Sequence, residues 1–169
     1  GGAAQYAIFR WAVGVADRVS RVREQGGEPR GLLAVQHRIA HKLVHSKLHA
    51  RFGGRLRFFI SGSAPLAPDI GRFFYGAGIT ILEGYGLTET TAGAFLTRPN
   101  DVRFGYVGLP LPGTEVRIAE DGEVMLRGEC VMQGYHNLSG STEAVLTEDG
   151  WFATGDIGEL ENGRLRITD

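Results

Sequence analysis

The first fifty residues carry two stretches with a helical pattern of apolar and polar positions. Between residues 5 and 24, apolar side chains recur at spacings of three and four, while arginines and an aspartate occupy the other side. Gly26 and Gly27 are expected to end this helix. A second helix is predicted over about residues 32–51, with one apolar face made of Leu32, Val35, Ile39, Leu43 and Leu48. The pattern predicts a helical hairpin that leads into a sheet.

The next stretch predicts a strand, a helix and a second strand. Residues 56–60 have the composition of a buried strand and run into a loop of small residues, 61–66. Pro68 suits the first turn of a helix, and residues 79–82 then predict another buried strand. Strands joined in this way are parallel, with a right-handed crossover. Ligands of open α/β sheets bind beyond the carboxyl ends of such strands.

From about residue 102 the pattern changes to short alternating segments, typical of antiparallel strands. Turn signals separate them at Pro112-Gly113, Asp121-Gly122 and Asn162-Gly163. One short helix is expected between residues 141 and 146. We therefore predict an α/β fold class: a parallel βαβ sheet portion with flanking helices over residues 1–101, followed by a small antiparallel β-barrel subdomain over residues 102–169.

Composition places the chain among ordinary soluble globular proteins. It has 169 residues, 43% hydrophobic and 22% charged, with a formal net charge of −1. This charge gives no reason to expect nucleic-acid binding. Cys130 is the only cysteine, so an internal disulfide is excluded and a reducing, cytoplasmic location is the simplest expectation. Glycine, with 26 residues, is about twice as frequent as usual, which indicates tight turns or backbone close to a ligand.

The second predicted helix is basic and rich in histidine. His37, His41, His45 and His49 are spaced four residues apart, and no acidic residue occurs between Pro29 and Pro68. Imidazoles one turn apart can share a metal, but no cysteine or carboxylate accompanies them. A solvated basic face is the default interpretation. Attraction to acidic lipid headgroups, and so a peripheral membrane contact, or to a polyphosphate ligand is the alternative.

Candidate chemistry follows the second strand of the βαβ unit. Gly84 and Gly86 flank Tyr85, and Thr88 and Glu89 come next. A hydroxyl can donate to a phosphate oxygen, and a carboxylate can hold the Mg²⁺ that accompanies a nucleotide. The alternative is a strand end, a glycine turn and a threonine N-cap without a ligand.

A second candidate lies in the predicted barrel. Asp156 follows Gly155, and an exposed carboxylate can accept hydrogen bonds from both hydroxyls of a ribose. A turn aspartate that caps its own loop is the alternative interpretation.

Four motifs in order resemble those of the adenylate-forming family, which includes acyl-CoA synthetases, peptide-synthetase adenylation domains and beetle luciferases. The motifs are Gly62-Ser63-Ala64-Pro65-Leu66, Tyr85-Gly86-Leu87-Thr88-Glu89, the series from Gly122-Glu123 through Arg127-Gly128 to Gly134-Tyr135, and Thr154-Gly155-Asp156. The helical hairpin and the segments at residues 58–62 and 82–86 resemble the long-chain fatty-acid CoA ligases in particular.

The resemblance implies a ligase that activates a fatty acid with ATP as an acyl-adenylate and transfers it to CoA. It implies that Ser63, Ala64 and Pro65 border the adenine and that Tyr85 and Gly86 also bind the nucleotide, with the tyrosine ring against the base. In the same way it implies that Thr88 touches the α-phosphate, Glu89 holds Mg²⁺, Asp156 binds the ribose and Gly84 lies by the acyl tunnel. Thr88 and Glu89 are then the catalytic residues.

Nothing in the chain matches the family's phosphate loop or its catalytic lysine. We therefore expect a fragment of an N-terminal domain that ends before the hinge, is inactive alone and tends to self-associate through uncovered apolar faces. The alternatives are a ligase for an amino acid or aryl acid, and a non-catalytic nucleotide-binding or interaction module.

Overall fold

The chain forms two compact units in the structure, a computed structural model that describes residues 2–169. The first unit contains the described residues up to Ile60 together with Leu66–Leu82. The second contains Ser61–Pro65 and Glu83–Asp169. Each unit is described by itself below. Gly1, the first residue of the predicted first domain, lies outside the described residues.

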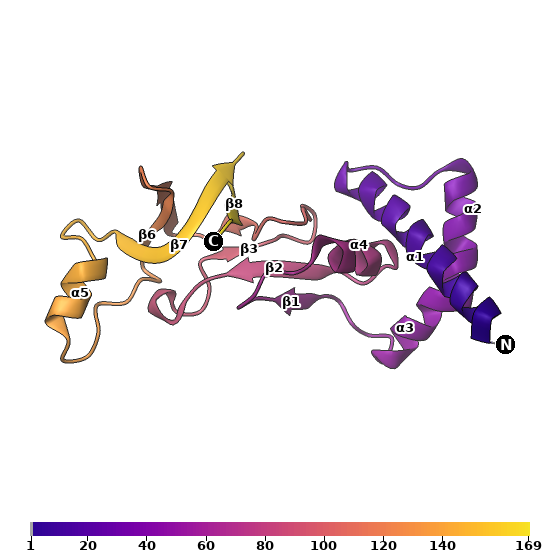
Figure 1. The fold of residues 1–169 in the computed structure, drawn as a ribbon, viewed down its shortest axis with the longest axis horizontal. Coiled ribbons are helices and arrows are strands. Elements are labelled where there is room, and N and C mark those ends of the chain that lie inside the picture. Colours follow the sequence, from indigo (N-terminus) through magenta and orange to yellow (C-terminus); the bar gives the residue numbers. More distant parts are fainter. Residues whose placement is uncertain (1) are drawn as a thin grey trace. The chain divides into compact units, whose positions relative to one another are not determined.

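The elements of both units follow the predicted order (Figure 1). Those that begin in the first unit are α1 (Gly2–Glu24), α2 (Gly31–Ala40), the π-helix η1 (His41–His45), α3 (Ser46–Arg51), β1 (Phe59–Ser61), α4 (Pro68–Gly76) and β2 (Ile81–Tyr85). Those of the second are the 3-10 helix η2 (Thr88–Thr90), β3 (Phe95–Leu96), β4 (Leu109–Pro110), β5 (Thr114–Ile118), β6 (Glu123–Gly128), α5 (Ser139–Val145), β7 (Phe152–Glu161) and β8 (Arg164–Ile167).

The first unit is built around α1, which lies against both α2 and α4 (Figure 1). Its core consists of small and β-branched side chains, namely Ala12, Val15, Val19 and Ala40. Small residues let the helices approach closely. A Cβ atom at Gly76 would lie only 1.9 Å from the carbonyl oxygen of Ala16. The last residue of α4 therefore has no room for a side chain.

The structure corrects the predicted orientation of the second helix. Leu32 is 73% exposed, and the rest of the predicted apolar face through Leu43 is exposed too. The histidine side of the helix packs inward instead. His37 and His49 donate hydrogen bonds of 2.9 Å to the carbonyl oxygens of Gly76 and Ala77 at the end of α4. Carbonyls at a helix C-terminus lack intrahelical donors, and the histidines satisfy them.

His37, His45 and His49 are at least partly buried, and only His41 of the four histidines is exposed, so the stripe as a whole is not the solvated face that was expected. Within residues 2–169, no group of three or more histidines, cysteines and carboxylates has the geometry to hold a metal ion. His45 is fully buried, and neither of its ring nitrogens makes a hydrogen bond. Its ring meets the edge of Phe73, with centroids 6.3 Å apart.

Burial, together with the neighbouring histidines, lowers the pKa of His45 from 6.5 to about 4. The Ala12 carbonyl opposes this without reaching hydrogen-bonding geometry.

We predict that His45 makes the first unit acid-sensitive. The unfolded chain binds a proton at His45 more readily than the folded chain does, so stability is complete above pH 6.5 and declines as the pH falls toward 4. Between pH 7.5 and pH 5, His45 should cost about 2 kcal/mol of unfolding free energy. His45→Phe keeps an aromatic ring at this position and should remove that part of the pH dependence, as measured by urea unfolding at several pH values.

His136→Phe is the matched control, because His136 is an exposed histidine outside the first unit. Its pH dependence should equal that of the unchanged chain. A His45→Phe variant that loses stability with acid as steeply as the parent would contradict the assignment.

The strands that carry the candidate site belong to a four-stranded sheet with the order β1-β2-β3-β4. β1 and β2 run in the same direction in Figure 1, whereas β3 pairs antiparallel with both β2 and β4. The sheet is therefore mixed. β1 is an edge strand, and Ile60 is 63% exposed. The prediction of a buried strand is wrong there because an edge strand has a sheet neighbour on only one side.

The second sheet is antiparallel, with the order β5-β6-β7-β8. A register shift between Glu123 and Met125 marks an irregularity opposite β7, which curves strongly in Figure 1. The core of this unit comprises Ala94, Phe95, Val124, Leu126 and Leu165. The predicted fold class, an α/β portion with flanking helices followed by a small antiparallel β-barrel subdomain, is confirmed, and the barrel part is a curled antiparallel half-barrel. None of the helices described over residues 2–169 is both long and apolar enough to cross a bilayer.

Candidate functional site

The segment after β2 is the centre of the candidate site. It is a short 3-10 turn rather than the start of a longer helix. Thr90 is fully buried, and its hydroxyl bonds the backbone of Leu87, accepting from the N–H at 2.9 Å and donating to the carbonyl at 3.1 Å. Thr88 is exposed, and its hydroxyl makes no hydrogen bond within residues 2–169, while its carbonyl accepts from the N–H of Thr91 at 3.2 Å. Of these two threonines, Thr90 shapes the turn and Thr88 presents a free hydroxyl.

Gly86 is required by the chain's own backbone. A Cβ atom at this position would lie 2.5 Å from the carbonyl oxygen of Ala92 and 2.9 Å from the nitrogen of Ala94. Real Cβ atoms do not approach backbone this closely. The space beside Gly86, which was expected to admit a ligand, is therefore occupied by the backbone of Ala92 and Ala94. Its predicted contact with a nucleotide stays a prediction.

Two motifs that are 71 residues apart meet at Tyr85. The Tyr85 hydroxyl donates a hydrogen bond of 2.6 Å to Oδ2 of Asp156. Burial and this carboxylate hold the pKa of Tyr85 well above its ordinary value, so the hydroxyl stays protonated and remains a donor. Part of the tyrosine ring packs against Phe95, with centroids 6.1 Å apart. The structure thus places the predicted ribose ligand next to the predicted adenine contact.

The Asp156 turn is itself fixed to β6. The Thr154 hydroxyl donates to the carbonyl of Val124 at 2.8 Å and accepts from the N–H of Asp156 at 3.1 Å. The N–H of Gly155 donates to the carboxylate of Glu123 at 2.7 Å. These contacts fix the backbone of the turn that carries Asp156. Sequence reasoning gave Glu123 no role, since its 32-residue separation from Gly155 carries no local signal.

The loop at residues 61–65 approaches the same strand end. A Cβ atom at Gly62 would lie 3.3 Å from the carbonyl oxygen of Gly84, so the two backbones are close. Ser63 has a left-handed backbone, with φ of 65°, which few non-glycine residues adopt. Ser63, Ala64 and Pro65 are all exposed. Their predicted place around the adenine remains a prediction.

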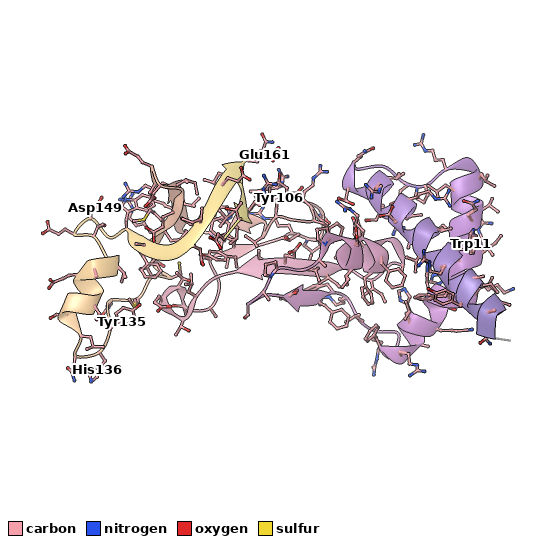
Figure 2. The ribbon with its side chains drawn as sticks, viewed as in Figure 1. Trp11, Tyr106, Tyr135, His136, Asp149 and Glu161 are labelled. Atoms are coloured by element: carbon pink, nitrogen blue, oxygen red, sulfur yellow. The ribbon has the colours of Figure 1, made fainter. Side chains whose placement is uncertain are left out.

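Sequence reasoning missed Tyr135 as a site residue. Its hydroxyl donates a hydrogen bond of 2.9 Å to Oε1 of Glu89, and this bond raises the pKa of the tyrosine above its ordinary value. Figure 2 shows Tyr135 in the segment that leads into α5. In the sequence, Gly134-Tyr135 is only the last part of the motif series that begins at Gly122-Glu123. The 46-residue separation from Glu89 gave no indication of contact.

The residues present fit a magnesium ion that arrives with a nucleotide. Mg²⁺ prefers oxygen ligands and usually binds one or two carboxylates together with substrate phosphates. Glu89 is half-buried and offers a carboxylate with only one oxygen engaged by Tyr135. Thr88 adds an exposed hydroxyl next to it. The donor set suits a metal shared with a phosphate better than a metal held by protein alone.

An α/β portion with hydroxyl and carboxylate groups after a strand, joined to a curled antiparallel sheet that supplies an aspartate, is the architecture of an adenylate-forming enzyme. The model of the AMP-binding enzyme family matches residues 29–136, and the chain belongs to this family.

Relatives with known names agree with the family. The chain is 45% identical over 163 residues to the long-chain-fatty-acid–CoA ligase FadD15 of Mycobacterium bovis, covering 95% of this chain and 27% of that protein. Among solved structures, apo MatB from Rhodopseudomonas palustris is similar with a TM-score of 0.65 and 30% identity, covering 76% of this chain and 28% of the other.

A malonyl-CoA ligase solved as a ternary product complex with methylmalonyl-CoA and AMP has a TM-score of 0.61 and 34% identity, covering 76% of this chain and 31% of the other. The chain therefore spans about a quarter to a third of the length of these relatives.

Proposed function

We propose that this chain is part of an ATP-dependent long-chain fatty-acid CoA ligase and carries a large share of its nucleotide site. The hydrogen bond between Tyr85 and Asp156 is the observation that carries the proposal, because it joins two separate motifs at one strand end. The 45% identity to a long-chain-fatty-acid–CoA ligase supports the choice of acid. The neighbour solved with methylmalonyl-CoA and AMP supports the choice of reaction.

In the first step, a fatty-acid carboxylate attacks the α-phosphorus of ATP, and pyrophosphate leaves as the acyl-adenylate forms. Negative charge builds up on the phosphoryl oxygens during this attack. The exposed Thr88 hydroxyl donates a hydrogen bond to the α-phosphate, and Glu89 holds the Mg²⁺, which supplies positive charge when bound. In the second step, the CoA thiol displaces AMP from the acyl carbon.

The remaining residues bind and orient the nucleotide. Asp156 accepts hydrogen bonds from the ribose hydroxyls, which its second oxygen and remaining lone pairs can do while Tyr85 donates to Oδ2. The ring of Tyr85 lies against the adenine, and the exposed loop of Ser63, Ala64 and Pro65 borders it. Gly86 shapes the nucleotide-binding turn. Gly84 lies by the acyl tunnel. Holding the ribose and the α-phosphate at once fixes the reacting phosphorus.

The test uses the intact enzyme that contains this chain. Acid-dependent exchange between ATP and pyrophosphate is measured with long-chain fatty acids, amino acids and aryl acids. Exchange that is fastest with long-chain acids supports the proposal. Exchange only with another acid class supports a different ligase of the family, and no exchange with any acid supports a non-catalytic module. The 169-residue chain alone should form no acyl-CoA, since it lacks the phosphate loop and the lysine that the family uses.

The basic hairpin supports a peripheral contact with anionic membranes for an enzyme that works in the cytoplasm. Leu32, Val35, Ile39 and Leu43 form an exposed apolar stripe on α2 and η1, and Arg38 and Lys42 lie exposed beside it. Apolar residues flanked by cations suit a lipid interface. Binding to anionic but not neutral vesicles would support this contact. Concentration-dependent self-association without vesicle binding would favour the same stripe as a contact between copies of the chain.

A further inference from the structure

Tyr135 reaches the candidate metal ligand from a segment that is bound to the same turn. The N–H of Met132 donates to the Glu89 carbonyl at 2.7 Å, and the Thr91 hydroxyl donates to the carbonyl of Cys130 at 2.8 Å. The hydroxyl of Tyr135 then donates to the Glu89 carboxylate at 2.9 Å. Both the backbone and the side chain of Glu89 are therefore held by one segment.

The tyrosine is fixed from its other side as well. Its N–H donates a hydrogen bond of 2.9 Å to the hydroxyl of Thr142 in α5. Gly134 has a φ of 148°, and a Cβ there would lie 2.8 Å from Cγ2 of Thr142. The ring thus starts from a backbone position that α5 determines. Because the donor is anchored independently of Glu89, it can restrict the carboxylate rather than follow it.

The geometry leaves the carboxylate able to bind a cation. An ionised carboxylate has about four acceptor positions on its two oxygens. Tyr135 uses one of them on Oε1, and Oε2 stays available. A glutamate side chain has three rotatable bonds, so an unrestrained one would lose conformational freedom on binding a metal. Partners that orient metal ligands typically change metal affinity or activity about 10–100-fold when they are removed.

We propose that Tyr135 is a positioning residue that holds the Glu89 carboxylate in the orientation needed to bind the Mg²⁺ of the nucleotide complex. This inference rests on the proposed function, which makes Glu89 a metal ligand. It adds a residue from the segment before α5 to a site otherwise built on β2 and the Asp156 turn. Tyr135 itself touches neither nucleotide nor acid in this role.

The first test measures how the intact enzyme depends on Mg²⁺. Tyr135→Phe removes only the hydroxyl and should raise the Mg²⁺ concentration for half-maximal ATP–pyrophosphate exchange about 10-fold, with little change in kcat at saturating Mg²⁺. Tyr106→Phe is the matched control. Tyr106 also donates to a carboxylate, that of Glu161, and the two lie side by side in Figure 2. Its Mg²⁺ dependence should stay unchanged.

The second test does not depend on activity. In the 169-residue chain with ¹³C-labelled tyrosine, the ring signal of Tyr135 at a fixed neutral pH should move in Glu89→Ala relative to the unchanged chain, because the acceptor of its hydroxyl is gone. A signal that does not move would show that the two side chains do not interact, and would overturn the proposal.

The outcomes separate the two proposals. If the unchanged enzyme exchanges pyrophosphate normally and Tyr135→Phe has the same Mg²⁺ dependence, or Tyr106→Phe shifts it equally, the positioning role is wrong while the proposed function stands. If the unchanged enzyme shows no exchange with any acid, the proposed function fails and the metal role of Glu89 falls with it.

Discussion

Glu89→Gln in the intact enzyme is expected to slow fatty-acid-dependent ATP–pyrophosphate exchange about 10²–10³-fold. Glutamine has nearly the same shape, and its amide oxygen can still accept the hydrogen bond from Tyr135. What it lacks is the negative charge that attracts Mg²⁺. Losing one group that stabilises charge in a transition state typically costs about 3–4 kcal/mol, which corresponds to this reduction in rate.

The exchange assay should be run at several Mg²⁺ concentrations, since part of the loss should appear as weaker activation by the metal. Glu120→Gln serves as the control because Glu120 is an exposed glutamate in the turn before β6. It should leave exchange within about two-fold of the unchanged enzyme, as expected for a surface substitution that changes stability by less than about 0.5 kcal/mol. Normal exchange by Glu89→Gln would show that Glu89 does not hold the metal.

Gly76→Ala is expected to destabilise the first unit by about 3 kcal/mol or more. The added methyl group would lie 1.9 Å from the carbonyl oxygen of Ala16 and 2.5 Å from its carbonyl carbon. Both atoms belong to the backbone of α1, so no side-chain rotation can relieve the clash. The helices must separate instead. This would also disturb the hydrogen bond from His37 to the Gly76 carbonyl. Urea unfolding of the 169-residue chain measures the loss.

Gly14→Ala provides the matched comparison within α1. A Cβ atom at Gly14 would meet nothing within 4 Å, and its backbone is helical. Alanine there should stabilise the chain by about 0.5–1 kcal/mol, because glycine is disfavoured inside helices. If Gly76→Ala lowers the free energy of unfolding and Gly14→Ala raises it, the close approach of Gly76 to the backbone of α1, and not the number of glycines, limits the stability of this unit. Equal effects would refute it.

The strand and turn elements were predictable because their signals are local. The dipeptides at Asp121-Gly122 and Asn162-Gly163 fix tight turns, and the observed strands β5 to β8 lie on either side of them. The short helix α5 was also expected, with its ends misplaced by one or two residues. The βαβ order likewise followed from strand composition and Pro68, which opens α4 as predicted.

The burial of the second helix could not be predicted in the same way. Its apolar residues and its histidines form two different faces, and periodicity favoured the apolar one. The inward face was decided by the carbonyl groups of Gly76 and Ala77, which needed donors from His37 and His49. Such a requirement is visible only when the end of α4 has been placed against the helix.

By itself, the sequence determined the order of elements and the family, and it predicted which residues bind a nucleotide, because motifs and turns are encoded by neighbours along the chain. The tertiary structure alone decided which of these residues hold one another: Tyr85 with Asp156, and Tyr135 with Glu89. Hydrogen bonds depend on distances of about 3 Å between atoms. Tyr85 and Asp156 are separated by 71 positions in the sequence, and Glu89 and Tyr135 by 46, so only the folded chain brings each pair within that range.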